Sequence, residues 1–116
     1  MRRVLLECDK KSEYTGNIYS MIEVQKMINK INKPIMGEIG YPKALDSTPV
    51  NPVIEVINFE IDGSTLYVEI NELEEVDWDR YRPAIRATGI VSEEGLVSDL
   101  NLLAVDLVEK EDNNVN

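Results

Sequence analysis

Residues 53–70 read VIEVINFEIDGSTLYVEI, and this stretch decides the fold. Its first half is rich in Val, Ile and Phe, which are residues that favour strands. In its second half Leu66, Val68 and Ile70 alternate with more polar residues, which is the period of a strand with one buried face. The dipeptide Asp62-Gly63 lies between the halves and favours a tight turn, because such turns need a positive φ. The stretch therefore predicts a β-hairpin.

Three further segments outside this hairpin have the composition of strands. They are residues 4–6, residues 84–91 and residues 96–108, and the last two are separated by the turn-forming sequence Glu93-Glu94-Gly95. With the hairpin they give about five strands, mostly joined by tight turns. Such connections are typical of antiparallel sheets, since parallel neighbours need long crossovers.

One segment carries the pattern of a helix. Ser20 is a good N-cap, Glu23 follows at the spacing of a capping box, and Pro34 marks the latest point at which the helix ends. Apolar residues recur between them at intervals of three and four, as on one face of an amphipathic helix: Met21, Val24, Met27, Ile28 and Ile31. Residues 34–52 contain four prolines and two glycines, so an irregular loop is expected there.

These elements predict one α+β domain over residues 1–108, followed by a polar C-terminal tail over residues 109–116. We expect a small curled antiparallel β-sheet or a partly closed β-barrel of about five strands, with one main amphipathic helix. The length of 116 residues is the usual size of a single domain.

The charge of the chain is strongly negative and unevenly distributed. The net charge is −10, with about +3 on residues 1–43 and −13 on residues 44–116. An acidic field of this kind repels nucleic acid and anionic lipid, so neither is an expected partner. The single cysteine, Cys8, rules out an internal disulfide and fits a reducing cytoplasm.

Most catalytic chemistry lacks the residues that it needs. The chain has no histidine, which is the usual base that activates a nucleophile near pH 7. Cys8 lies between Glu7 and Asp9, and negative neighbours suppress its thiolate. Zinc and EF-hand calcium sites lack their ligand patterns, so no metal and no cofactor is expected.

Several segments occur in an order that a known protease family shares. They are NIY at 17–19 before the helix, the loop MGEIGYP at 36–42, the hairpin described above, RATGI at 86–90 and VSDLNLLAVDLV at 97–108. Over residues 17–108 the chain resembles the prohead maturation proteases of tailed phages, relatives of the herpesvirus assemblin-type serine proteases. That family has a G-E-L-G-H-P-like loop, an S-S-R-G-like strand and a closing strand of the type D-F-x-L-x-x-x-D-L-V.

The resemblance implies that the catalytic residues of the family are missing. Its histidine corresponds to Tyr41, and its nucleophilic serine corresponds to Arg86 or Ala87. A tyrosine with a pKa near 10 is no base at neutral pH, and neither arginine nor alanine attacks a carbonyl. The chain is therefore expected to be a pseudo-protease and not an enzyme.

Two functions are compatible with this resemblance. The first is a structural role in phage head assembly, as a homo-oligomer that also binds another protein, in the infected host cytoplasm or on the virion. Its interface candidates are Tyr41, Trp78 and Tyr81, since aromatic residues anchor interfaces, although partial burial in the core is the alternative for each.

The second is a regulatory or counter-defence binder that sequesters a small ligand or inhibits a host protein. Its site is formed by the degenerate active site: Glu38, Tyr41, Arg86 and Thr88. Arg86 is a candidate contact for a small anionic ligand, as a cation on the acidic part of the chain, although an exposed ion pair with one of the many acids is the alternative.

Overall fold

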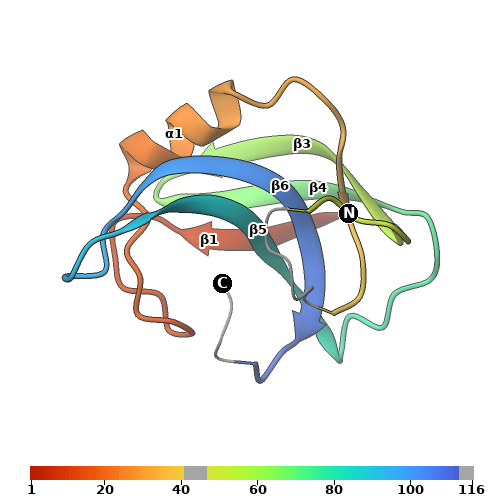
Figure 1. Ribbon diagram of the computed structural model, residues 1–116. Coiled ribbons are helices and arrows are strands. Elements are labelled where there is room, and N and C mark those ends of the chain that lie inside the picture. The colour runs from red at the N-terminus through yellow and green to blue at the C-terminus, as the bar shows by residue number, and fades with distance from the viewer. Residues whose placement is uncertain (41–46, 113–116) are drawn as a thin grey trace.

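The computed structural model describes residues 1–40 and 47–112, and it contains one helix and six strands in these ranges (Figure 1). The elements are β1 (Arg2–Glu7), α1 (Met21–Asn29), β2 (Ile35–Gly37), β3 (Ile54–Asp62), β4 (Thr65–Glu72), β5 (Tyr81–Val91) and β6 (Val97–Glu109). One sheet has the order β1-β4-β3-β2 and the other pairs β5 with β6, and every ladder is antiparallel. The predicted α+β class is confirmed, with two sheets that are not closed into a barrel.

The β3–β4 hairpin forms as expected, with its turn displaced by one residue. Asp62 pairs with Thr65, so Gly63 and Ser64 are the central residues. Gly63 has φ 63° and Ser64 has no positive φ, so the turn is of type II′, which favours glycine at its first central position. In β4, Leu66, Val68 and Ile70 are buried as the alternation predicted, and they form part of the core between the two sheets.

The two sheets meet along β2 and β6. Ile39 and Leu107 form a parallel bridge, in which the Leu107 N–H donates to the Glu38 carbonyl at 2.9 Å and the Gly40 N–H donates to the Leu107 carbonyl at 2.8 Å. Gly37 makes this approach possible, because a Cβ at this position would lie 1.6 Å from the carbonyl oxygen of Val105. The glycine is therefore required by contact between backbones.

The helix begins as predicted and ends early. The Ser20 hydroxyl accepts a hydrogen bond from the Glu23 N–H, and Val24 and Met27 are the buried residues of α1. Regular structure stops at Asn29, five residues before the proline. The helix contacts β6 and lies across one end of the space between β3 and β6, which the three-residue β2 is too short to fill (Figure 1).

Other boundaries also differ from expectation. The segment expected to be irregular contains β2, and β5 begins at Tyr81 in spite of Pro83, which is tolerated because β5 is an edge strand. The tail is attached over its first part, since the Lys110 N–H donates to the Arg80 carbonyl. Residues 113–116 lie outside the described ranges. No helix in residues 1–40 and 47–112 combines the length and apolar character that a membrane span requires.

Cys8 lies immediately after β1 and is almost fully buried. Its N–H donates to the Ser64 carbonyl at 2.7 Å, so the end of β1 is attached to the turn of the β3–β4 hairpin. Burial and the neighbouring Asp9 and Glu7 raise the pKa of the thiol. The thiol is therefore protonated and packed as a core side chain, in agreement with the prediction that it is not reactive.

We predict that Gly37→Ala costs about 3 kcal/mol of unfolding free energy or more, because the atoms that its methyl group meets are backbone atoms that cannot rotate away. Gly16→Ala is the control, since nothing lies within 4 Å of that position and only its φ of 79° opposes the substitution, at a cost of about 1 kcal/mol. Urea unfolding of both variants measures the difference, and equal losses would contradict the close contact between β2 and β6.

Candidate functional site

Arg86 lies at the centre of a buried ion-pair cluster. It projects from β5, and its exposed fraction is 0%. Its Nε donates to Oδ2 of Asp106 at 2.8 Å, and its Nη2 donates to Oδ1 of the same carboxylate at 2.8 Å. Asp106 lies on β6 and is also 0% exposed. The pair is therefore bidentate, which is the strongest geometry available to a guanidinium and a carboxylate.

Glu38 extends this cluster to the loop that follows β2. Its Oε1 accepts from Nη2 of Arg86 at 2.9 Å, and its Oε2 accepts from the backbone N–H groups of Val50 and Asn51 at 3.3 and 3.1 Å. Nη1 of Arg86 donates to the Ser47 carbonyl at 3.0 Å. The cluster thus joins β5, β6, the end of β2 and residues 47–51.

The pKa values of the two carboxyl groups of the cluster are shifted in opposite directions. The hydrogen bond from Arg86, with help from the Asn51 and Val50 N–H groups, lowers the pKa of Glu38 below its ordinary value. Burial raises the pKa of Asp106, against the opposing hydrogen bonds from Arg86 and from the Glu38 N–H. The side chain of Glu38 is 20% exposed, and its lowered pKa means that the protein environment favours its ionised form.

Arg86 is buried and not exposed as expected, but it does form ion pairs with acidic residues, which was the alternative to an anion site. The carboxylates of Asp106 and Glu38 and the carbonyl of Ser47 engage all three of its nitrogens. A small anion would have to displace one of these internal acceptors. Asp106, the bidentate partner of Arg86, was not among the residues predicted for the site. The signal was present, because Asp106 stands alone in the apolar run LLAVDLV.

The other candidate residues are not brought into this cluster. Thr88 is exposed on β5 opposite Asn101, and Tyr41 lies outside the described residues. Trp78 is half-buried, with its Nε1 donating to Glu72 at 2.9 Å and the guanidinium of Arg3 4.3 Å from its ring. Tyr81 is also half-buried and packs against the core. Much of the surface of these two aromatic residues is thus in contact with their own chain.

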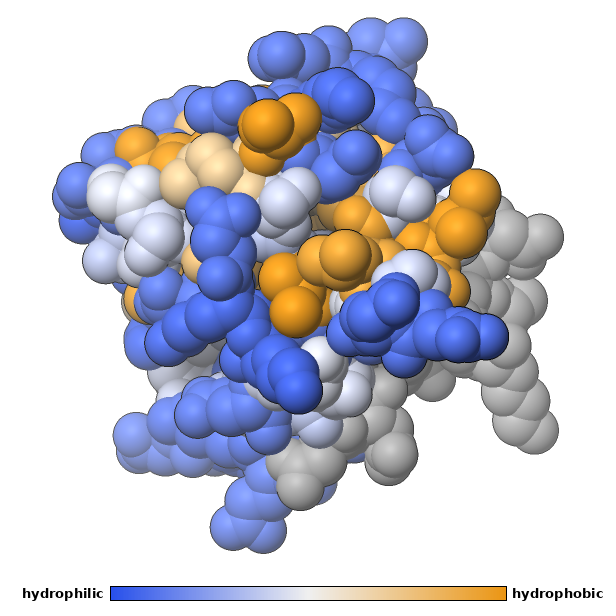
Figure 2. Space-filling model, turned by 90° about the vertical axis from the view of Figure 1, so that its left-hand side faces the viewer, coloured by the Kyte–Doolittle hydropathy of each residue, from blue (hydrophilic) through white to orange (hydrophobic). Residues whose placement is uncertain are grey.

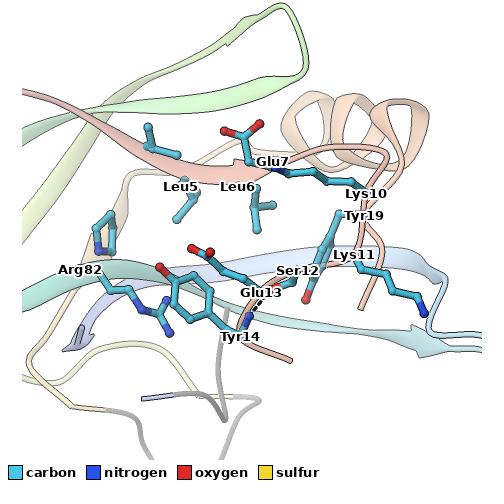
Figure 3. A pocket seen from close by; sticks show the side chains of 12 residues that line it. Leu5, Leu6, Glu7, Lys10, Lys11, Ser12, Glu13, Tyr14, Tyr19 and Arg82 are labelled. Carbon is cyan, nitrogen blue, oxygen red and sulfur yellow. Dashed lines mark hydrogen bonds between the residues drawn. The ribbon is translucent and has the colours of Figure 1, made fainter. Parts of the chain in front are cut away.

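A separate cleft lies between β1 and β5, two strands of different sheets that do not pair with each other (Figure 3). Its volume is about 340 Å³. Leu5 and Leu6 of β1 form one apolar wall and the segment 10–19 closes one side (Figure 3), while Arg82 and Pro83 of β5 form the opposite wall. The dimensions suit a small molecule or a few side chains.

The lining of this cleft is partly apolar and partly charged, and its charged residues are more basic than the rest of the molecule. Lys10, Lys11 and Arg82 contribute three positive charges, against two negative charges from Glu7 and Glu13. The Arg82 guanidinium stacks 3.5 Å from the ring centroid of Tyr14 and also donates to the Asp112 carbonyl at 2.6 Å. This stack forms one end of the cleft.

The sequence reading did not find this cleft. The residues that form it come from two strands and a loop that are distant in the sequence, and of the segments that carry the family resemblance only Asn17-Ile18-Tyr19 contributes, through Tyr19. The adjacent pair Lys10-Lys11 in a loop after a strand was the only local signal. The described residues contain no group of three or more acidic or cysteine side chains arranged to hold a metal ion.

Comparison of the chain with protein-family models, with curated proteins and with solved structures found no match.

We predict that Asp106→Asn costs about 3–5 kcal/mol of unfolding free energy, because it leaves the buried Arg86 without the charge of its bidentate partner. Asp99→Asn, the same change at an exposed position of the same strand, is the control and should change stability by no more than about 0.5 kcal/mol. Asparagine also tolerates the positive φ of 53° at that position. Chemical denaturation measures both, and a small loss in Asp106→Asn would show that the pair is dispensable.

The lowered pKa of Glu38 predicts a specific dependence of stability on pH. Because the folded-state pKa lies below the ordinary value of 4.5, Glu38 stabilises the fold fully above pH 4.5 and loses this effect as the pH falls through the folded-state pKa. The stability difference between the native chain and Glu38→Gln should therefore be largest at neutral pH and shrink below pH 4.5. A difference that is constant from pH 7 to pH 3 would contradict the ion pair.

Proposed function

We propose that this chain is a non-catalytic relative of the prohead maturation proteases of tailed phages, which acts through protein–protein contacts in head assembly. One observation carries the proposal. The G-E-I-G segment and the part of β5 that starts at Arg86 correspond to the two segments that hold the base and the nucleophile in that family. They are in direct contact here, since Glu38 and Arg86 are joined at 2.9 Å. Contact between these segments is what a former active site requires.

The chemistry of this contact supports a structural role. The position of the nucleophile or its neighbour holds a buried guanidinium, and the chain contains no imidazole. Both carboxylates of the cluster accept hydrogen bonds from Arg86 and from backbone N–H groups. Groups that are saturated by internal partners hold the fold together and are poorly placed to act on a substrate.

An exposed apolar surface supports the interaction with other proteins. Figure 2 views the side of the molecule at which α1 begins and both hairpin turns lie, and apolar side chains gather there within a hydrophilic surround. At the start of α1 and around the β5–β6 turn, the exposed apolar residues are Ile22, Ile90, Val91 and Leu96. Apolar side chains gathered in this way on a surface are typical of protein interfaces. We call these four residues the hairpin-tip surface.

We predict that the chain is present in proheads or heads purified from cells infected by the phage that encodes it, and that it self-associates in solution. Antibody detection in the particles and light scattering of the pure protein test the two statements. Val91→Asp in the hairpin-tip surface should weaken one or both associations without loss of stability, because Val91 is 53% exposed. Leu73→Asp, at an exposed residue on the loop after β4, is the control. A strict monomer absent from both particles would refute the proposal.

The β1–β5 cleft favours a second candidate function, a binder that sequesters a small amphipathic anion. Its apolar walls and the exposed cations Lys10 and Lys11 suit a ligand with an apolar body and a negative group. The proposed anion site is thus in this cleft and not at Arg86.

A thermal-shift screen against nucleotides and apolar carboxylic acids tests this second function, since a ligand that binds the folded state alone raises the melting temperature. We expect a shift that is reduced in Lys11→Glu and retained in Lys26→Glu, the same change on the exposed face of α1. Absence of any shift across the screen would count against it.

A further inference from the structure

The outer edge of β3 is open over much of its length. On one side, β3 pairs with β4 from Ile54 to Asp62. On the other side, β2 pairs only with Ile54, Glu55 and Val56. In residues 1–40 and 47–112, no strand pairs with residues 57–62 on the side away from β4.

The register shows which backbone groups face this open edge. Asp62 and Thr65 close the two-residue turn and exchange hydrogen bonds, so Glu60 and Asn58, at intervals of two, also direct their N–H and C=O groups toward β4. Phe59 and Ile61 alternate with them and therefore direct their backbone groups away from β4. These groups form a row of donors and acceptors of the kind to which an additional strand binds.

A groove runs beside this edge, between β3 and α1. Two adjoining hollows of about 380 and 310 Å³ form it, and both are lined by Ile28 of α1 and Phe59 of β3. Ile61 lines the first hollow and Ile31 the second. These four side chains are half-buried and pack on the core, so their outer surfaces form an apolar floor.

The charge beside the groove is negative. The strand β3 contains three acidic residues and no basic residue. Glu60 and Asp62 are well exposed, at 57% and 69% of their side chains, and they point to the face opposite Phe59 and Ile61. Arg2 approaches them only at 3.6 and 3.5 Å, and an exposed pair of this length does little to neutralise them. Lys33, at the end of the second hollow, is the only charged residue among those that line the groove.

We propose that the groove between α1 and β3 binds an extended basic segment of a partner protein, which adds to the sheet as a strand antiparallel to β3. Apolar side chains at alternate positions of this segment enter the two hollows, opposite Phe59 and Ile61. The intervening Lys or Arg side chains lie on the other face, beside Glu60 and Asp62. This inference rests on the proposed action through protein contacts, but it requires no role in phage heads.

The probe for this site is a fluorescent ten-residue peptide in which Val and Lys alternate. In antiparallel pairing, residues directly opposite each other project to the same face, so the Val amides face β3. N-methylation of the two central Val amides should therefore weaken binding at least about tenfold, because it removes hydrogen bonds to the edge. N-methylation of the two central Lys amides, which face away, should weaken it much less. Fluorescence anisotropy measures all three peptides against the whole chain.

Two variants test the contribution of the groove itself. Glu60→Lys should weaken binding of the Val–Lys peptide at least about tenfold, and Glu75→Lys, an equal charge change in the acidic segment after β4, should have a smaller effect. Hydrogen exchange of the Phe59 and Ile61 amides should slow when the peptide binds. All variants are compared at matched stability, which circular dichroism establishes.

Three results would overturn the inference. They are equal loss of affinity for the two methylated peptides, equal effects of Glu60→Lys and Glu75→Lys, and unchanged exchange at Phe59 and Ile61 with bound peptide. Each would show that the acidic chain attracts the peptide through its overall charge alone, or that the peptide binds elsewhere. None of these measurements involves phage particles, so the site and the role in head assembly can fail separately.

Discussion

The buried pair between Arg86 and Asp106 is the interaction on which the rest of the structure depends. A guanidinium removed from water is tolerated only where carboxylates and carbonyls replace its hydration, and here three segments that are distant in sequence supply them. The β5–β6 hairpin contributes the bidentate pair, and Glu38 and the loop after it complete the set. Residues 47–51 are therefore held against the β5–β6 hairpin by the buried charge of Arg86 and by Glu38.

Patterns that are local in the sequence predicted local structure well, and contacts between distant segments were not predictable from them. The alternation of Leu66, Val68 and Ile70 correctly gave the buried face of β4, and Ser20 correctly gave the start of α1. The strand β2 was missed because three residues are too few for a period, and its pairing depends on β3 and β6. For the same reason Arg86 was expected at the surface, since its acceptors lie 20 and 48 residues away.

Two gaps between strands that do not pair with each other in the described residues are also places where binding is proposed, namely the β1–β5 cleft and the groove beside β3. Between β1 and β5 the segment 10–19 stands where a ladder would run, and between β3 and β6 the helix stands beside a short β2 (Figures 1 and 3). A loop or a helix does not match the flat edge of a strand, so a hollow remains at each of these two places. The cleft and the groove thus have one cause, an incomplete set of strands around a common core.

The burial of Cys8 gives the chain a natural reporter of its own motions. A thiol reacts with a labelling reagent only when it reaches solvent as a thiolate, and this one is sealed where β1 meets the turn of the β3–β4 hairpin. Because the chain has no other cysteine, the rate of labelling reports on the exposure of this one site. The kinetics of opening beside the β1–β5 cleft can therefore be followed on the native chain, without an engineered probe.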